Sequence, residues 1–161
     1  IEQETPSLLF AGLDARQTAQ LRLAIGADLP IYGTSQLNPR TLADWQFSEP
    51  IDGLESVRLV DIPWQLQSDH PAVMVYPHLV ESPDQTHGPV IERLYALGID
   101  AFRVAREIAL ARTVFQIDGV TGKLMVNFNG ASAYFKRIEQ PALYQNGVIV
   151  PLNAGKTPAQ P

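Results

Sequence analysis

The three histidines have the widest chemical repertoire in this sequence, and all of them fall in one proline-rich stretch. His70, His78 and His87 are spaced eight and nine residues apart, with carboxylates between them. Imidazole and carboxylate groups bind zinc, but structural zinc sites favour closer spacing and catalytic sites usually lie on regular elements. We therefore expect solvated loop histidines and no metal site.

A serine nucleophile is the next possibility. Ser35, His70 and Asp61 are the residue types of a catalytic triad. Ser35 stands in Gly-Thr-Ser-Gln, however, whereas the nucleophile turn of the α/β-hydrolases has a glycine two residues away on either side of the serine. Asp61 and Asp69 are separated by a proline and a tryptophan, so nothing fixes a carboxylate pair for acid–base catalysis. We expect no catalytic residues and interpret the protein as not an enzyme.

The turn Gly12-Leu13-Asp14 is a candidate anion site, because it precedes a helical pattern whose first N–H groups are free. It lacks the G-x-G-x-x-G spacing of a dinucleotide site and the lysine of a P-loop. We interpret it as an ordinary strand-to-helix turn and expect no cofactor.

Residues 7–36 are the scaffold that would position these side chains, and they predict a strand, a helix and a second strand. Residues 8–10 are an unbroken apolar run, typical of a strand covered on both faces. Asp14 and Gln17 predict a capping box at the start of the helix, and Gly26 predicts a left-handed stop at its end. Helical spacing places three residues inward and three mostly outward: Thr18, Leu21 and Ile25 against Arg16, Gln20 and Arg22.

Residues 29–32 and 57–61 would add two more strands, each reached by a crossover and parallel to the first. Between them, Asn38 and Pro39 predict the cap and first position of a short helix over residues 40–45. Such sheets bind ligands beyond the carboxyl ends of their strands.

Polar and aromatic side chains follow the carboxyl ends of these strands. Ser35 and Gln36 come after the second strand, and Asp61 and Trp64 come at the end of the third. These four residues are therefore candidate ligand contacts. Two alternatives remain for Trp64: an exposed ring on a surface turn that stacks on a ligand or anchors a protein partner, or a partly buried ring over the core.

Residues 65–88 predict an irregular connection between subdomains, with one extended piece at residues 72–76. Pro89 opens the longest helical pattern, and Gly98 within it predicts close packing against another element. The apolar positions that recur every three or four residues, and should face the core, are Val90, Leu94, Leu97, Ala101, Phe102, Ala105, Ile108 and Ala109.

From residue 114 onward the apolar period changes to two. Three dipeptides mark tight turns between strand-like runs: Asp118-Gly119, Asn129-Gly130 and Asn146-Gly147. We expect residues 123–128, 134–138 and 148–152 to form an antiparallel meander.

Composition excludes several classes of protein. The chain has 161 residues, 45% of them hydrophobic, and a net charge of −5, which indicates a globular protein and disfavours nucleic acid and acidic membranes as partners. It has no cysteine, hence no disulfide and no thiolate chemistry. No run is long enough to span a membrane. The polar start leads directly into a buried-type strand, so we expect a piece of a longer protein.

Three ordered passages give the sequence a family resemblance: Tyr32-Gly-Thr-Ser-Gln36, then Val57-Arg-Leu-Val-Asp-Ile-Pro-Trp64, then Arg93-Leu-Tyr-Ala-Leu-Gly-Ile-Asp-Ala-Phe102 with Ile117-Asp-Gly-Val-Thr-Gly-Lys-Leu124. Together they resemble the C-terminal domain of the LppC/LpoA lipoproteins, the penicillin-binding protein activators. That resemblance implies an α/β, type I periplasmic-binding-protein-like fold, here as a partial domain.

On this reading, residues 1–64 form a βαβαβ part of one lobe and residues 65–88 connect the lobes. Residues 89–152 form a helix plus a β-meander, and residues 153–161 a disordered tail. The resemblance also implies a periplasmic regulator, held at the outer membrane by a lipid outside this piece, which activates a class A penicillin-binding protein in peptidoglycan synthesis. The alternative is a solute-binding module that captures an amino acid or a cell-wall fragment.

Overall fold

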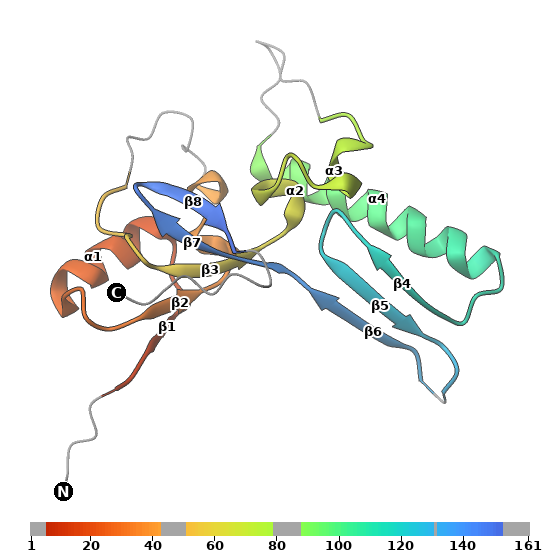
Figure 1. The fold of residues 1–161 in the computed structure, drawn as a ribbon, viewed down its shortest axis with the longest axis horizontal. Coiled ribbons are helices and arrows are strands. Elements are labelled where there is room, and N and C mark those ends of the chain that lie inside the picture. Colours follow the sequence, from red (N-terminus) through yellow and green to blue (C-terminus); the bar gives the residue numbers. More distant parts are fainter. Residues whose placement is uncertain (1–5, 43–50, 79–87, 131, 153–161) are drawn as a thin grey trace, which may run out of the picture. The chain divides into compact units, whose positions relative to one another are not determined.

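The computed structural model describes residues 6–42, 51–78, 88–130 and 132–152 (Figure 1). The chain divides into two compact units, one formed by residues 1–61 with 141–161 and the other by residues 62–140. We call them unit 1 and unit 2. This division differs from the predicted one, because residues 141–152 return to the unit that opens the chain.

Unit 1 contains a five-stranded sheet in the order β1-β2-β3-β7-β8. Its strands are β1 (Leu9–Ala11), β2 (Ile31–Gly33), β3 (Arg58–Asp61), β7 (Gln140–Gln145) and β8 (Val148–Pro151). Phe10 pairs with Tyr32 and Gly33 pairs with Leu59, both in parallel ladders. The predicted parallel arrangement of the first three strands is therefore confirmed.

Helix α1 (Ala15–Ile25) connects β1 to β2. The Asp14 carboxylate accepts a hydrogen bond from the Gln17 N–H at 2.8 Å, and the Gln17 side-chain oxygen accepts one from the Asp14 N–H at 3.3 Å. Gly26 ends the helix at φ +83°. Both predicted end signals are confirmed. Arg22, however, is buried, and its guanidinium donates to the carbonyl oxygens of Leu29 and Glu55. Arg22 was predicted to point outward, and this was wrong because the backbone carbonyl oxygens of Leu29 and Glu55 lie on this side of the helix and accept its hydrogen bonds.

The last two strands do not join the predicted meander. β7 and β8 pair antiparallel through a tight turn in which Asn146 and Gly147 have φ values of +52° and +75°. They belong to the sheet of unit 1, so the prediction that residues 148–152 extend the other antiparallel sheet was wrong. A period of two identifies a strand, but it does not identify the sheet that the strand joins.

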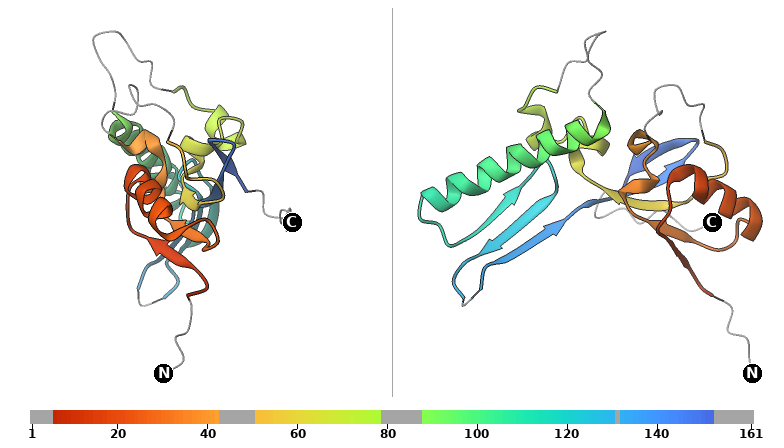
Figure 2. Two further views of the ribbon diagram at one scale, coloured as in Figure 1. Left: turned by 90° about the vertical axis from the view of Figure 1, so that its left-hand side faces the viewer. Right: turned by 180° about the vertical axis from the view of Figure 1, so that it is seen from behind.

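Unit 2 contains a three-stranded antiparallel sheet and a long helix, α4 (Pro89–Ala109), that runs along it (Figure 2). The strands are β4 (Val114–Asp118), β5 (Lys123–Asn127) and β6 (Tyr134–Ile138). Val104 of α4 packs on Phe115, Ile117 and Val126 of the sheet. The predicted strands at 123–128 and 134–138 are confirmed.

Two short segments differ from prediction. Residues 72–76 were expected to be extended, but Pro71–Met74 form a helical turn, α3, because Pro71 suits a first helical position and His70 caps the turn. Asn38 and Pro39 do start a helix, the 3₁₀ turn η2 (Pro39–Thr41), which follows a similar turn, η1 (Ser35–Leu37). Residues 43–45 of the predicted helix lie outside the described residues.

Helix α4 turns the opposite face to the core from the one predicted. The residues that pack inward are Ala96, Ile99, Asp100 and Val104, whereas Leu94, Leu97, Phe102 and Ile108 are exposed. The inner face also holds the buried Asp100 side chain. The hydrophobic period locates an apolar stripe but not the neighbour that covers it.

Candidate functional site

The carboxyl ends of β2 and β3 are tied together by a buried polar pair. Asn38, between the two 3₁₀ turns, donates from Nδ2 to the Asp61 carboxylate at 2.8 Å, and both side chains are buried. Asn38 Oδ1 accepts a hydrogen bond from the Arg40 N–H at 3.1 Å. Asp61 therefore anchors the loop after β2 to the end of β3.

Turn η1 places the other two predicted contact residues of unit 1. Thr34 caps it, with Oγ1 accepting a hydrogen bond from the Gln36 N–H at 3.3 Å. Ser35 is half-buried and Gln36 is exposed, so both polar groups are open to solvent. The structure thus groups Ser35, Gln36 and Asp61 at one edge of the sheet, with only the first two accessible.

Two further features hold η1 against the sheet. A Cβ atom on Gly33 would lie 2.9 Å from the Ala11 carbonyl oxygen and would also collide with the Leu37 side chain, so the turn requires glycine there. The Tyr144 hydroxyl, from β7, donates to the Leu37 carbonyl oxygen at 2.7 Å. Burial raises the pKa of the Tyr144 phenol above its usual range.

Trp64 lies in the core of unit 2, in the short helix α2 (Pro63–Leu66), and its side chain is only 4% exposed. The His78 ring lies over it with centroids 4.2 Å apart, and the Tyr95 ring meets it edge-on at 5.6 Å. Of the two alternatives, the structure has the buried ring, and the surface turn was wrong. The apolar residues packed with Trp64 are Ile62, Val73, Ala96, Ile99 and Val120.

The histidines in the described part of the chain have structural roles. His70 Nδ1 accepts a hydrogen bond from the Ala72 N–H at 3.2 Å, and Nε2 lies 3.6 Å from an Asp118 carboxylate oxygen. The expectation of solvated loop histidines was therefore wrong for His70, whose side chain is only 15% exposed, whereas His78 is exposed although its ring contacts Trp64. His87 lies outside the described residues. Within the described ranges no group of three or more metal-ligand side chains gathers.

Asp100 holds the turn after β4 against α4 through a set of hydrogen bonds that the sequence analysis did not predict, and we call this set the Asp100 clasp. Its buried carboxylate accepts three hydrogen bonds from the turn after β4: from the Val120 N–H at 3.1 Å, and from the Thr121 N–H and hydroxyl at 2.7 Å each. Arg103 adds an ion pair at 3.2 Å. Val120 in turn accepts a hydrogen bond from the Trp64 N–H, so one carboxylate orders α4, the turn and α2. Asp100 and Thr121 each lie in a passage that the sequence analysis singled out, but no local pattern indicates that the two passages are in contact.

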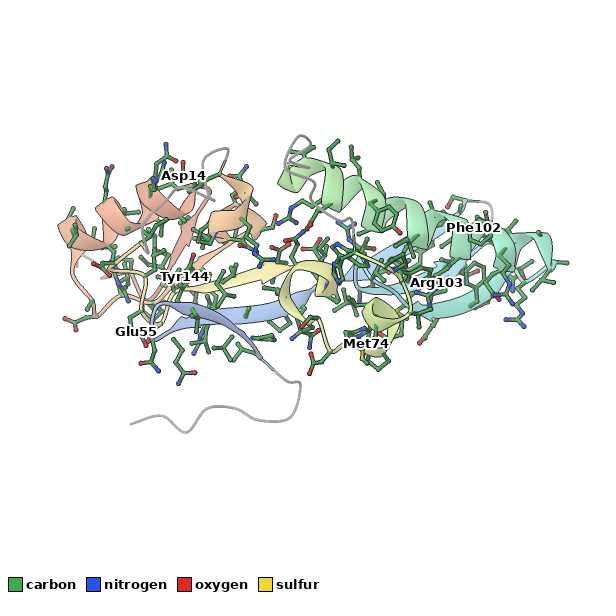
Figure 3. The ribbon with its side chains drawn as sticks, turned by 90° about the horizontal axis from the view of Figure 1, so that it is seen from above. Asp14, Glu55, Met74, Phe102, Arg103 and Tyr144 are labelled. Carbon is green, nitrogen blue, oxygen red and sulfur yellow. The ribbon has the colours of Figure 1, made fainter. Side chains whose placement is uncertain are left out.

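A surface hollow of about 240 Å³ lies beside this clasp, between α4 and β4. Its charges are mixed, because Arg112 pairs with Glu107 and Arg103 pairs with Asp100. Figure 3 shows Arg103 on the side of α4 toward the strands and Phe102 toward its outer edge. The lining residues are Arg103, Arg106, Glu107, Arg112, Gln116, Ile117 and Asp118.

Comparison with solved structures gives the class of protein. A putative branched-chain amino acid ABC transporter from Chromobacterium violaceum ATCC 12472 has a TM-score of 0.65 and 37% identity, over 86% of this chain and 42% of the other. The C-domain of LpoA (YraM) from Haemophilus influenzae, described as a regulator of PBP1A, has a TM-score of 0.63 at 22% identity, over 94% and 47%. The fold is that of the periplasmic-binding-protein-like α/β proteins.

The family follows from the sequence comparison. The profile described as "LppC putative lipoprotein" matches residues 9–146, and the chain belongs to this family. It is also 36% identical over 102 residues to the penicillin-binding protein activator LpoA of Edwardsiella piscicida. That match covers 62% of this chain but 13% of the relative, so the chain spans a small part of that protein.

None of the described helices is both long enough and apolar enough to cross a membrane.

Proposed function

We propose that this chain is part of a non-enzymatic regulator that binds and activates a class A penicillin-binding protein, the bifunctional synthase of peptidoglycan. One observation carries the proposal: the family match over residues 9–146, reinforced by 36% identity to a relative named for this activation. The family description as a lipoprotein supports a periplasmic location with a lipid anchor at the outer membrane.

The use of the polar side chains favours a regulator over an enzyme. Asp61 is buried against Asn38, Asp100 serves as a clasp, and His70 caps a helical turn. Each of these groups therefore contributes to the folded state of its own unit. A general acid or base must reach a substrate proton, and these three side chains are already hydrogen-bonded to groups of their own unit.

An activator of this kind works through differential affinity. It must bind the active conformation of the synthase more tightly than the resting one, since equal affinity for both shifts no population. To raise the active fraction of a mostly resting synthase tenfold, the activator must bind the active conformation about tenfold more tightly than the resting one. This difference corresponds to about 1.4 kcal/mol of binding free energy.

A binding measurement tests whether the regulator binds the synthase, which activation requires. The 161-residue chain and the longer protein expected to contain it are immobilised separately, and a purified class A synthase is passed over each. We expect the longer protein to capture the synthase and an unrelated periplasmic binding protein to leave it in solution. Absence of capture by the longer protein would refute the proposal, and the result for the chain alone locates the contact.

A solute-binding module is the second candidate, and 37% identity to a protein described as a putative branched-chain amino acid transporter favours it. The ligand contacts would come from Ser35, Gln36, Asp61 and Trp64, of which the first two are solvent-accessible. A bound amino acid needs partners for both of its charges, and the burial of Asp61 and Trp64 argues against this candidate. A melting temperature that rises with leucine or wall-peptide concentration would support it.

A further inference from the structure

The two asparagine–glycine dipeptides are a chemical feature that the proposed function does not use. Asn129-Gly130 lies between β5 and β6, and Asn146-Gly147 lies between β7 and β8. An asparagine that precedes glycine can lose its side-chain amide, because glycine has no Cβ to keep its backbone nitrogen away from the asparagine side chain. The dipeptides are identical, so a difference in their reactivity would come from the fold around them.

The reaction is a ring closure within the chain. A base removes the proton of the glycine N–H, and the nitrogen forms a bond to the asparagine Cγ. The bond from Cγ to Nδ2 breaks, and Nδ2 takes a proton from water and leaves as ammonia. Water then opens the succinimide ring at either carbonyl and leaves aspartate or isoaspartate. Ring closure requires rotation about the asparagine ψ, because this rotation brings the glycine nitrogen to Cγ.

Asn146-Gly147 is held in a conformation that opposes this rotation. The dipeptide forms a two-residue turn closed by the pair of Gln145 and Val148, and its φ values are +52° and +75°. The Asn146 N–H also donates to the Glu55 carboxylate at 2.9 Å. Rotation about ψ of Asn146 would separate β8 from β7, so ring closure there requires the hairpin to open first.

Asn129-Gly130 lacks these restraints in the part of the chain that the structure describes. Both residues are exposed and lie outside the strand ladder, whose final pair is Asn127 with Tyr134. The Asn129 N–H donates to Asn127 Oδ1 at 2.8 Å, but no described group accepts a hydrogen bond from the Gly130 N–H. A Cβ on Gly130 would meet only an ordinary contact, 3.6 Å from the Ser132 carbonyl oxygen. Rotation about ψ of Asn129 therefore breaks no strand pair.

We propose that Asn129 is a site of spontaneous deamidation in the folded protein and that the β7–β8 hairpin protects Asn146. The product adds a negative charge to a chain whose net charge is already −5. An isoaspartate product also routes the backbone of the β5–β6 connection through the side-chain Cβ and Cγ of residue 129. The inference is independent of synthase activation.

Peptide mapping distinguishes the two sites. Trypsin places Asn129 in the peptide 124–136 and Asn146 in the peptide 138–156, and deamidation appears as the mass of OH in place of NH₂. The 161-residue chain is incubated at mildly alkaline pH, either folded in buffer or unfolded in guanidinium chloride. Tandem mass spectrometry follows each site with time. Gly130→Ala is the test variant, because its added Cβ hinders the attacking nitrogen, and circular dichroism checks its folding.

We expect Asn129 to deamidate about tenfold faster than Asn146 in the folded chain, which corresponds to about 1.4 kcal/mol for opening the hairpin. In guanidinium chloride the two rates should agree within about twofold, because unfolding removes the hairpin. Folded Gly130→Ala should slow deamidation at Asn129 by about tenfold and leave Asn146 unchanged.

A rate at Asn129 no faster than at Asn146 in the folded chain would overturn the inference. The same ratio of rates after unfolding would also overturn it, since local sequence would then account for the difference. An Asn129 rate unchanged in folded Gly130→Ala would exclude the ring closure. If that variant does not fold, the folded and unfolded native chains still decide between these outcomes.

Discussion

Three buried side chains, Asp61, Asp100 and Tyr144, use groups capable of chemistry to hold turns in place. Asp61 accepts a hydrogen bond from Asn38, Asp100 accepts three from the turn after β4, and Tyr144 donates to Leu37. Buried polar groups cost free energy unless they are hydrogen-bonded, so each of these residues is bound to its partner in the folded state.

Asp100→Asn should lower the free energy of unfolding of unit 2 by about 3 kcal/mol. The variant keeps one acceptor oxygen and turns an amide NH₂ toward backbone donors, which leaves at least one buried N–H unpaired. Asp118→Asn is the matched control, since its side chain is 57% exposed and its ion pair with His70 contributes less than about 1 kcal/mol. Denaturant unfolding of both variants in a Trp45→Phe background, followed by Trp64 fluorescence, measures the two free energies of unfolding. Equal losses in the two variants would contradict the role given to the Asp100 carboxylate.

Tyr144 should make unit 1 sensitive to alkaline pH. Its phenol has a raised pKa in the folded state, so the unfolded chain ionises first as the pH passes about 10. The stabilising contribution is therefore complete below pH 10 and is lost above it, by up to about 1.4 kcal/mol per pH unit.

The variant Tyr144→Phe should be about 1 kcal/mol less stable than the native chain at pH 7, because it lacks the hydrogen bond to Leu37. Above pH 10 the difference should narrow, since the variant has no phenol to ionise. The control Tyr134→Phe, at a residue 55% exposed, should follow the native profile. Parallel profiles for Tyr144→Phe and the native chain from pH 8 to 11 would refute the assignment.

Sequence separation explains which of these contacts could be predicted. The capping box joins Asp14 and Gln17, three residues apart, and a local pattern identifies it. Arg22 and Glu55 are 33 residues apart, and Asp100 and Thr121 are 21 apart. No local rule reports such pairs, so Arg22 was placed outward and the role of Asp100 was missed.

At the scale of elements, the β7–β8 hairpin shows how much a turn dipeptide determines. Asn146-Gly147 and Asn129-Gly130 look alike in sequence, but only the first has both residues at positive φ. The first closes a tight hairpin in unit 1, and the second lies in the longer connection between β5 and β6. The Asn-Gly dipeptide predicted a turn in both places. The type of each turn depends on the strands that the turn connects.

Gly147→Ala should therefore destabilise unit 1 by about 1 kcal/mol, because alanine is strained at a φ of +75°. Gly130→Ala should change stability by less than about 0.5 kcal/mol, since an added Cβ would meet only an ordinary contact at 3.6 Å. Midpoints of urea unfolding for the two variants provide the comparison. A cost at Gly130 that equals the cost at Gly147 would contradict this account of the turns.

Helix α4 shows the limit of periodicity for a whole element. Its existence and its start at Pro89 were predicted, and the structure confirms both. The predicted inward face is exposed instead, because apolar spacing identifies a stripe but not the face of the helix that the rest of the chain covers. The same limit explains why residues 148–152 were placed in the wrong sheet.

At the scale of the whole chain, two units share one polypeptide that leaves unit 1 after β3 and returns to it through β7. The family match over residues 9–146 includes parts of both units. The sequence predicted the family because its motifs keep their order along the chain. It could not predict the packing of α4 and β8, which depends on partners distant in sequence.

Class A synthase activity tests the proposed role most directly. Purified synthase is supplied with lipid-linked precursor, with and without the longer protein expected to contain this chain, and the cross-linked fraction of the muropeptide products is measured. Activation predicts a higher cross-linked fraction that saturates with added protein. A cross-linked fraction unchanged at saturating protein, with binding to the synthase demonstrated, would contradict it.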